Sequence, residues 1–320
     1  MPLILTGILA VSHLGGCGKT EESVTIRVGA MSGPTAMGMV KLMSDSEAGL
    51  TENTYEFADL ATDATAMVTP IATGELDIAA VPSNLASNIY AKTEGGVEVL
   101  AVNALGVLNL VERGETISGI ADLAGKTVYA TGQGAVPEYT IRYLLTQAGL
   151  DADSDLEIIW CADTTEALSY VSTVDGAIAI LPQPFVTVAC SKVEDLRIVL
   201  DLNEAWNEVS PDAGICTGVI VVRREFAEKY PEQVKKFLEE YEASVAYTQT
   251  NTDEAAELIA NYGIVGAAGV AKNALPGCHI VCLTGDEMKT NLSAFLQVLY
   301  DQNPASVGGS LPGDDFYYAD

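Results

Sequence analysis

The stretch Lys126–Leu145, KTVYATGQGAVPEYTIRYLL, has the order of features that builds a strand, a tight turn and a helix. Residues Thr127–Ala130 have strand character, and the polar turn Thr131–Gly134 follows them before an apolar helical stripe. Pro137 suits the first turn of that helix, where its missing N–H costs nothing. Unpaired N–H groups and the partial positive charge of a helix start favour a carboxylate, phosphate, sulfonate or carbonyl oxygen. The stretch therefore predicts an α/β fold and ligand capture at the turn.

A chain that only has to bend sharply produces the same strand–glycine–helix pattern, so one turn does not establish a ligand site. A dinucleotide site is not expected, because Pro137 stands where the third glycine of that fingerprint belongs. No cofactor is therefore predicted. Glu138 stands one helical turn before Arg142, and we expect these two side chains to form an ion pair.

Composition narrows the class of protein. The 320 residues are 48% hydrophobic and 19% charged, which is typical of a globular chain long enough for two lobes. With 44 acidic and 16 basic residues the net charge is −28, so the surface repels nucleic acid and anionic lipid. No apolar run reaches the length of a transmembrane helix.

The N-terminus has the pattern of a secretion signal. Pro2–Gly16 is uncharged, mostly apolar and ends in small residues before Cys17. The ending Leu14-Gly15-Gly16-Cys17 is similar to a bacterial lipobox, in which the cysteine is lipidated. No Lys or Arg precedes the apolar segment and His13 interrupts it, which is compatible with a start further upstream, and an N-terminal core strand is the alternative interpretation. A lipid at Cys17 would tether the domain to the membrane without spanning it.

The remaining cysteines are odd in number, so at least one free thiol is expected if no partner chain pairs with it. They are Cys161, Cys190, Cys216, Cys278 and Cys282. Cys278-His279-x-x-Cys282 invites a metal site, but a structural zinc needs four ligands and the sequence has no second Cys/His cluster. We therefore predict no metal and interpret these residues as buried small side chains.

Polar turns follow several apolar strands along the chain. Segments such as Val24–Ala30 and Leu76–Val81 read as strands, whereas the pattern after Arg223 is mainly helical, with long segments such as Glu225–Thr248. Gly214–Val222 reads as one long apolar strand. In open α/β sheets ligands bind outside the carboxyl ends of the strands, where these turns fall. The expected ligand-binding residues are Ser32, Gly33, Thr35, Pro82, Ser83, Asn84, Asn103, Thr131, Gly132, Gln133, Gly134 and Gln183. For Asn103, a hydrogen-bonded core amide is the alternative.

From Val24 to Tyr318 the chain resembles the type II substrate-binding proteins of ABC importers, in the branch of nitrate, taurine, sulfonate and Thi5-like binding proteins. The resemblance rests on the lipobox-like Cys17 and on several motifs in a fixed order. These are Gly74-Glu75-Leu76-Asp77-Ile78-Ala79 before Pro82, Asp122-Leu123-Ala124-Gly125-Lys126, Leu181-Pro182-Gln183-Pro184-Phe185, and Arg223-Arg224-Glu225-Phe226 followed by Tyr230-Pro231-Glu232.

The resemblance implies two Rossmann-like lobes of α/β structure, joined by a two-strand hinge, that close on a small molecule and dock on a membrane permease served by an ATPase. Residues 1–16 would be a signal peptide and 17–23 a lipidated linker. Lobe 1 would comprise 24–108 plus 219–320, and lobe 2 would comprise 109–218. The implied protein is a monomer outside the cytoplasm, lipid-anchored to the bacterial cell membrane.

Five polar strand ends contain no Arg or Lys: Ser32–Thr35, Pro82–Asn84, Asn103, Thr131–Gly134 and Pro182–Gln183. Gln183 also replaces a Glu that relatives often carry between two prolines. This pattern favours a small neutral or zwitterionic organic ligand, including flat heterocycles, over sulfonate or nitrate. An enzyme is the main alternative class, but a Ser/His/Asp triad is not available with His279 as the single histidine after the signal. The cysteine cluster and reactive histidine of Thi5-like enzymes are not found either. A ligand-sensing or adhesion module on the same fold is the third class.

Overall fold

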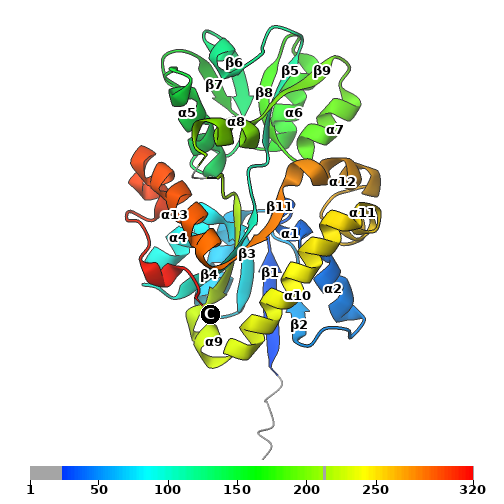
Figure 1. Cartoon of the computed structure of the whole chain (residues 1–320). Coiled ribbons are helices and arrows are strands. Elements are labelled where there is room, and N and C mark those ends of the chain that lie inside the picture. The colour runs from blue at the N-terminus through cyan, green and yellow to red at the C-terminus, as the bar shows by residue number, and fades with distance from the viewer. Residues whose placement is uncertain (1–23, 212–213, 320) are drawn as a thin grey trace, which may run out of the picture.

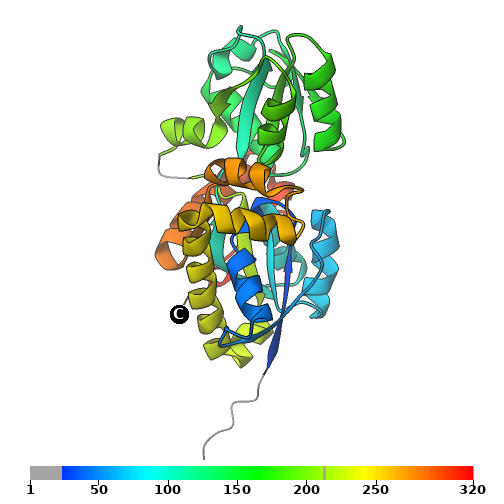
Figure 2. The ribbon, with the colours of Figure 1, turned by 90° about the vertical axis from the view of Figure 1, so that its right-hand side faces the viewer.

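The structure is a computed structural model that describes residues 24–211 and 214–319. Within these residues the strands form two separate sheets, and each sheet with its helices makes one lobe. Figures 1 and 2 show the smaller lobe, drawn in green, stacked on the larger one. No helix of the described residues is long and apolar enough to cross a membrane.

The sheet of lobe 1 has the order β11-β4-β10-β3-β1-β2. Strand β10 runs antiparallel to both of its neighbours, whereas β1 is parallel to β2 and to β3. Its strands are β1 (Thr25–Ala30), β2 (Thr54–Phe57), β3 (Ile78–Pro82), β4 (Val97–Ala104), β10 (Gly218–Arg223) and β11 (Ile280–Leu283).

The sheet of lobe 2 has the order β7-β6-β8-β5-β9 and repeats the same plan, because β5 runs antiparallel between β8 and β9. Its strands are β5 (Leu108–Arg113), β6 (Thr127–Ala130), β7 (Glu157–Trp160), β8 (Ile178–Pro182) and β9 (Leu196–Asp201). In each lobe, the inserted antiparallel strand is the one that the chain enters from the other lobe. The predicted α/β class with two lobes is confirmed.

Helices cover both faces of each sheet. Those of lobe 1 are α1 (Pro34–Met37), α2 (Val40–Glu47), α3 (Val68–Thr73), α4 (Ser83–Lys92), α9 (Arg224–Lys229), α10 (Pro231–Thr250), α11 (Thr252–Asn261), α12 (Ala268–Ala274) and α13 (Gly285–Gln302). Those of lobe 2 are α5 (Val136–Gln147), α6 (Thr164–Thr173), α7 (Phe185–Lys192) and α8 (Leu202–Val209). Short 3₁₀ turns are η1 (Ala64–Met67), η2 (Ile120–Leu123), η3 (Leu275–Cys278), η4 (Pro304–Val307) and η5 (Asp314–Phe316).

Successive side chains along the strands of lobe 1 point to opposite faces of the sheet and therefore belong to two different hydrophobic cores. In β3, Ile78 and Ala80 face the core under α2, α10 and α11, whereas Ala79 and Val81 face the core under α4 and α13. The second of these cores continues into lobe 2, where it includes residues of α5 and α8. Burial of this alternating pattern fixes the register of the central strands.

Two segments cross between the lobes. Residues 105–107 lead from β4 to β5, and the segment after α8 leads back to β10. Gly218 at the start of β10 pairs with Pro82 and Ala104, while Leu108 at the start of β5 pairs with Pro182. The carboxyl ends of β3 and β4 in one sheet therefore face the carboxyl end of β8 in the other.

Several predicted elements differ from those observed. The expected helix over 36–43 is divided into α1 and α2 around Gly38, where a Cβ would lie 2.7 Å from the Tyr241 hydroxyl. The apolar run from Gly214 enters the sheet only at Gly218, because the preceding residues form the crossing segment. The expected helix Glu225–Thr248 is broken before Pro231, which begins α10. Helix α8 and strand β11 were not expected.

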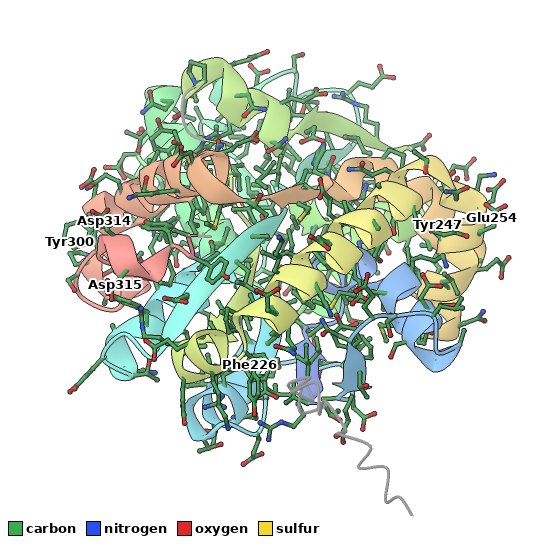
Figure 3. The ribbon with its side chains drawn as sticks, turned by 60° about the horizontal axis from the view of Figure 1, so that its bottom comes forward. Phe226, Tyr247, Glu254, Tyr300, Asp314 and Asp315 are labelled. Carbon is green, nitrogen blue, oxygen red and sulfur yellow. The ribbon has the colours of Figure 1, made fainter. Side chains whose placement is uncertain are left out.

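Acidic side chains lie at opposite edges of lobe 1. Figure 3 shows Asp314 and Asp315 at one edge and Glu254 at the opposite edge. The Asp314 side chain is 92% exposed and pairs with Lys289. The strongly negative charge is thus a solvated surface, as expected for charges spread along the sequence.

Candidate functional site

The turn after β1 is supported by a hydrogen bond from the buried side chain of Asn103. Its side-chain amide donates to the Thr35 carbonyl at 2.8 Å, and the Thr35 hydroxyl donates to the Met31 carbonyl. Asn103 has no exposed surface and is thus a core amide that supports the turn, the alternative stated above. The buried Tyr241 hydroxyl interacts with the side chain of Asn103. Ser32 and Gly33, which precede α1, are partly exposed.

The turn after β3 is tied to the returning crossing segment. The Ser83 hydroxyl donates to the Cys216 carbonyl at 2.5 Å, and the Ser83 N–H donates to the Thr217 carbonyl. Asn84 is nearly buried, and Pro82 caps the start of α4. Ser83 therefore has a structural role at the edge where the chain changes lobes.

The turn after β6 needs glycine at its second position, residue 132. Gly132 has a φ of +82°, and a Cβ there would lie 2.7 Å from Pro137. Gln133 and Gly134 are exposed, whereas Thr131 and Gly132 are half-buried. The turn thus keeps the compact geometry that its sequence predicts.

Glu138 accepts a hydrogen bond from one of the N–H groups at this helix start. Its carboxylate accepts from the Gly134 N–H at 2.7 Å and from Arg142 at 2.8 Å, so the predicted Glu138–Arg142 ion pair is confirmed. Arg142 also bonds Asp153. A carboxylate of the protein itself therefore stands where the sequence suggested an incoming anion.

Gln183 follows β8 at the edge that faces lobe 1. Its N–H donates to the Val107 carbonyl in the first crossing segment, and its Oε1 accepts from the Thr187 hydroxyl at 2.8 Å. The side chain is almost buried, and its end faces Gly277 of η3. Gln183 thus lies where the two lobes meet.

The sequence-predicted residues fall into two groups. Thr35 and Asn103 meet at Gly218, where a Cβ would contact both side chains, and Ser83 lies at the same sheet edge through its register with β10. The turn Thr131–Gly134 and Gln183 lie at the facing edge of the other sheet, since β6 runs parallel to β8. The polar turns of the two lobes therefore face each other across the crossing segments, as binding between two lobes requires.

His279 also lies in this region, next to the first crossing segment. Its backbone is left-handed, with φ 43°, and its Nδ1 contacts the Gly106 carbonyl. Nε2 lies 3.7 Å from a carboxylate oxygen of Asp201 in lobe 2. A cavity of about 410 Å³ lies beside it, lined also by Leu105 and residues of α10, η3 and β11. The sequence around His279 contains no pattern that predicts this contact with the crossing segment.

The five cysteines of the described residues are all unpaired. Burial raises the pKa of Cys216 and Cys278 to about 12, and burial with Glu242 nearby does the same for Cys282. Within residues 24–211 and 214–319, no group of three or more His, Cys, Asp or Glu side chains is placed to hold a metal ion. The expected lipidation residue, Cys17, lies outside the described residues.

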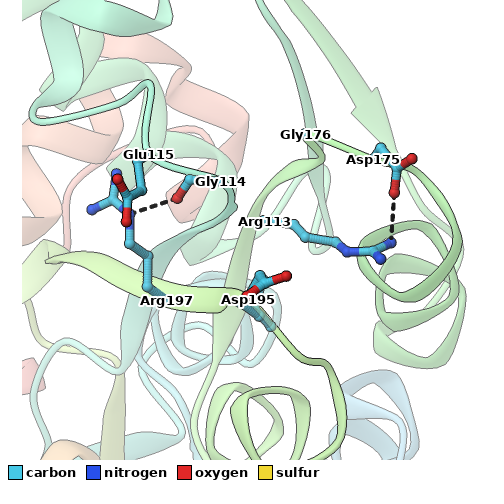
Figure 4. A pocket seen from close by; sticks show the side chains of 8 residues that line it. Arg113, Gly114, Glu115, Asp175, Gly176, Asp195 and Arg197 are labelled. Atoms are coloured by element: carbon cyan, nitrogen blue, oxygen red, sulfur yellow. Dashed lines mark hydrogen bonds and ion pairs between the residues drawn. The ribbon is translucent and has the colours of Figure 1, made fainter.

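Another cavity, of about 500 Å³, lies at the far end of lobe 2 (Figure 4). Its lining includes Arg113, which pairs with Asp175, and Arg197, which bonds the Gly114 carbonyl and the buried Glu112. It is formed where β5 ends and β9 begins, opposite the edge that carries Gln183. Its cations are already paired, and it is separate from the candidate site.

Two α/β lobes of matching topology, joined by two crossings and with polar turns on their facing edges, define the periplasmic-binding-protein fold. A family model described as NMT1/THI5 like matches residues 62–255, more than half of the chain. The chain therefore belongs to the NMT1/THI5-like family, in agreement with the resemblance found in the sequence. No curated protein matches the chain significantly.

Solved structures of binding proteins resemble this fold over nearly the whole chain. An ABC transporter protein from Parabacteroides distasonis is 22% identical, covering 92% of this chain and 99% of its own, with a TM-score of 0.79. The periplasmic aliphatic sulphonate binding protein SsuA from Escherichia coli is 16% identical, covering 92% of both chains, with a TM-score of 0.72. The alkanesulfonate-binding protein SsuA from Xanthomonas axonopodis pv. citri, bound to MOPS, is 11% identical, covers 90% of this chain and 94% of its own, and has a TM-score of 0.64.

Proposed function

We propose that this protein is the extracytoplasmic solute-binding subunit of an ABC importer, which captures a small organic molecule between its lobes and delivers it to a permease. The observation that carries the proposal is the meeting of polar strand ends from two sheets at a pair of crossing segments. Membership of the NMT1/THI5-like family supports it, as does the similarity to binding proteins of transporters.

The charges at the site favour a neutral or zwitterionic ligand. The predicted contact residues include no Arg or Lys. Glu138 already accepts from the Gly134 N–H, so an anion at this turn would compete with a carboxylate held by Arg142. A sulfonate or nitrate would have to bind through amides and hydroxyls alone, which provide weaker contacts than a charged donor.

The proposed role is binding without chemistry. Catalysis by a histidine and a nucleophile needs the two in contact. The Nδ1 of His279 is used by the Gly106 carbonyl, and the neighbouring Cys278 is buried with a pKa raised by that burial. Neither group is arranged for nucleophilic attack.

A lipid on Cys17 is the proposed means of attachment to the cell membrane, after removal of residues 1–16. The segment before Cys17 and the absence of a membrane-crossing helix from the described residues support this arrangement. A monomer with one such anchor is the proposed working form, with permease and ATPase subunits as its partners.

A thermal-shift screen of the mature domain against small metabolites tests the proposed function. The set should contain uncharged heterocycles, zwitterions and aliphatic sulfonates. A true ligand at about a hundred to a thousand times its dissociation constant is expected to stabilise the fold by about 3–4 kcal/mol. Stabilisation by a sulfonate alone would contradict the ligand class, and conversion of the ligand by the pure protein would contradict binding without chemistry.

A further inference from the structure

The lobes touch on both flanks of the crossing segments, and one flank is an apolar core. Trp206 of α8 has no exposed surface, and its ring centre lies 4.3 Å from that of Tyr143 in α5 and 5.6 Å from that of Phe295 in α13. Tyr139 of α5 adds polar contacts, because its carbonyl accepts from Gln302 at 3.0 Å and its hydroxyl is bonded by Asn303. This flank, which we call the tryptophan flank, joins the lobes by buried side chains.

The other flank is held by the approach of Gln183 to Gly277. A Cβ built on Gly277 would lie 2.9 Å from Nε2 and 3.3 Å from Cγ of Gln183. Helix α7, which follows Gln183, packs against α12, which precedes η3 (Figure 1). We call this contact the glycine flank.

Gly277 is required there for space and not for backbone conformation. Its φ lies outside the left-handed region, so an L-residue can adopt the same backbone. Gln183 has little freedom to move aside, because it is almost buried and its Oε1 is held by Thr187. A side chain at position 277 would therefore press directly on lobe 2.

We propose that the lobes close until the Gln183 side chain of lobe 2 contacts Gly277 of lobe 1. The tryptophan flank is the pivot of this movement. Separating the tryptophan flank would expose a buried tryptophan and its aromatic partners, which is costly. Separating the glycine flank exposes one amide side chain, a glycine and the contact between α7 and α12. Opening therefore occurs at the glycine flank, and the bulk of residue 277 sets how far the lobes close.

Distances between spin labels across each flank test this inference. Lys192→Cys on α7 with Lys272→Cys on α12 reports the glycine flank, and Gln147→Cys on α5 with Gln297→Cys on α13 reports the tryptophan flank. All four positions are exposed. Burial raises the pKa of the native thiols at Cys216, Cys278 and Cys282, which slows their labelling, and the chain without added cysteines serves as the blank.

Gly277→Val is expected to lengthen the α7–α12 distance by about 2 Å or more, because side chains in contact need roughly 4 Å between heavy atoms. The α5–α13 distance should stay unchanged. Adding Gln183→Ala to Gly277→Val removes the obstructing side chain and should restore the α7–α12 distance. Gly277→Ala, which adds a Cβ but not the two further methyl groups of valine, should give a smaller lengthening.

An unchanged α7–α12 distance in Gly277→Val, or a failure of Gln183→Ala to restore it, would overturn the proposal. Lengthening across the tryptophan flank would overturn the assignment of the pivot. If the valine variant does not fold, Gly277→Ala with and without Gln183→Ala decides the matter by the same comparison.

The effect on binding rests on the proposed function, because it needs a ligand between the lobes. For a ligand found in the thermal-shift screen, Gly277→Val should weaken affinity by about tenfold or more, whereas the distances need no ligand. If the α7–α12 distance changes but the screen finds no ligand, the assignment of the pivot is supported and only the proposed function is contradicted.

Discussion

At the scale of single residues, two polar groups of the proposed ligand site already have hydrogen-bond partners within the protein. Glu138 satisfies the Gly134 N–H, and Thr187 satisfies the Oε1 of Gln183. The sequence indicated the residues of these turns but not their partners, since a hydrogen bond within a turn depends on side-chain rotamers. Only the Glu138–Arg142 pair followed from spacing alone.

Glu138→Ala is expected to make the turn more receptive to anions. The substitution frees the Gly134 N–H and removes a negative charge, so affinity for ethanesulfonate should rise by about three- to tenfold, as one hydrogen bond of about 1 kcal/mol implies. Calorimetric titration measures this change. Glu138→Gln is the matched control, because it keeps an acceptor for the N–H while removing the charge, and its gain should be smaller.

Equal ethanesulfonate affinity in Glu138→Ala and wild type, with both proteins folded, would show that this turn does not contact the anion. The loss of the helix-start contact should cost about 1 kcal/mol of stability. The melting temperature of Glu138→Ala, measured on the same samples, should fall by an amount that corresponds to this loss of stability.

At the scale of elements, the strands of both sheet centres were predictable because they are apolar and end at polar turns. β3 has this pattern, and it is found at Ile78–Pro82, within two residues of the expected Leu76–Val81. Helix α8 was missed because its short amphipathic segment, LNEAWNEV, directly continues the strand before it. β11 was missed because it is only four residues long and pairs irregularly with β4, in a segment that also contains Cys278, His279 and Cys282.

Trp206→Ala in α8 is expected to destabilise the protein by about 3–5 kcal/mol, because it removes a fully buried aromatic side chain between the lobes. Urea denaturation measures the loss. Trp160→Ala is the matched control, since Trp160 is only partly buried on β7 of lobe 2 alone and should cost less. Equal losses in the two variants would argue against a central role for Trp206.

At the scale of the whole molecule, two lobes could be inferred from chain length and from the repeated strand–turn–helix pattern. Their relation in space could not, because it depends on contacts such as Trp206–Phe295 between residues far apart in sequence. The net charge of −28 argues against nucleic acid as a partner but does not identify a ligand. The site was predictable as a set of turns, whereas the roles of Asn103 and Ser83 as supports emerged only from their buried partners.

Cys17→Ala in the full chain is expected to abolish the proposed membrane attachment, because the lipid would be carried by the Cys17 thiol. The variant should move from the membrane fraction to the soluble fraction, or accumulate unprocessed, when cells are separated by centrifugation. Cys190→Ala serves as a control that removes a thiol from the folded domain. Unchanged processing and membrane retention of Cys17→Ala would contradict the lipid anchor.

The core shared by α5, α8 and α13 has a consequence for unfolding. The aromatic side chains around Trp206 come from both lobes and pack in one core. Neither lobe can therefore unfold without exposing part of the interior of the other. The two lobes should therefore lose their structure in one cooperative transition, and hydrogen exchange in their central strands should share a single free energy of opening. Two separate calorimetric peaks would show that the lobes are thermodynamically independent despite this shared core.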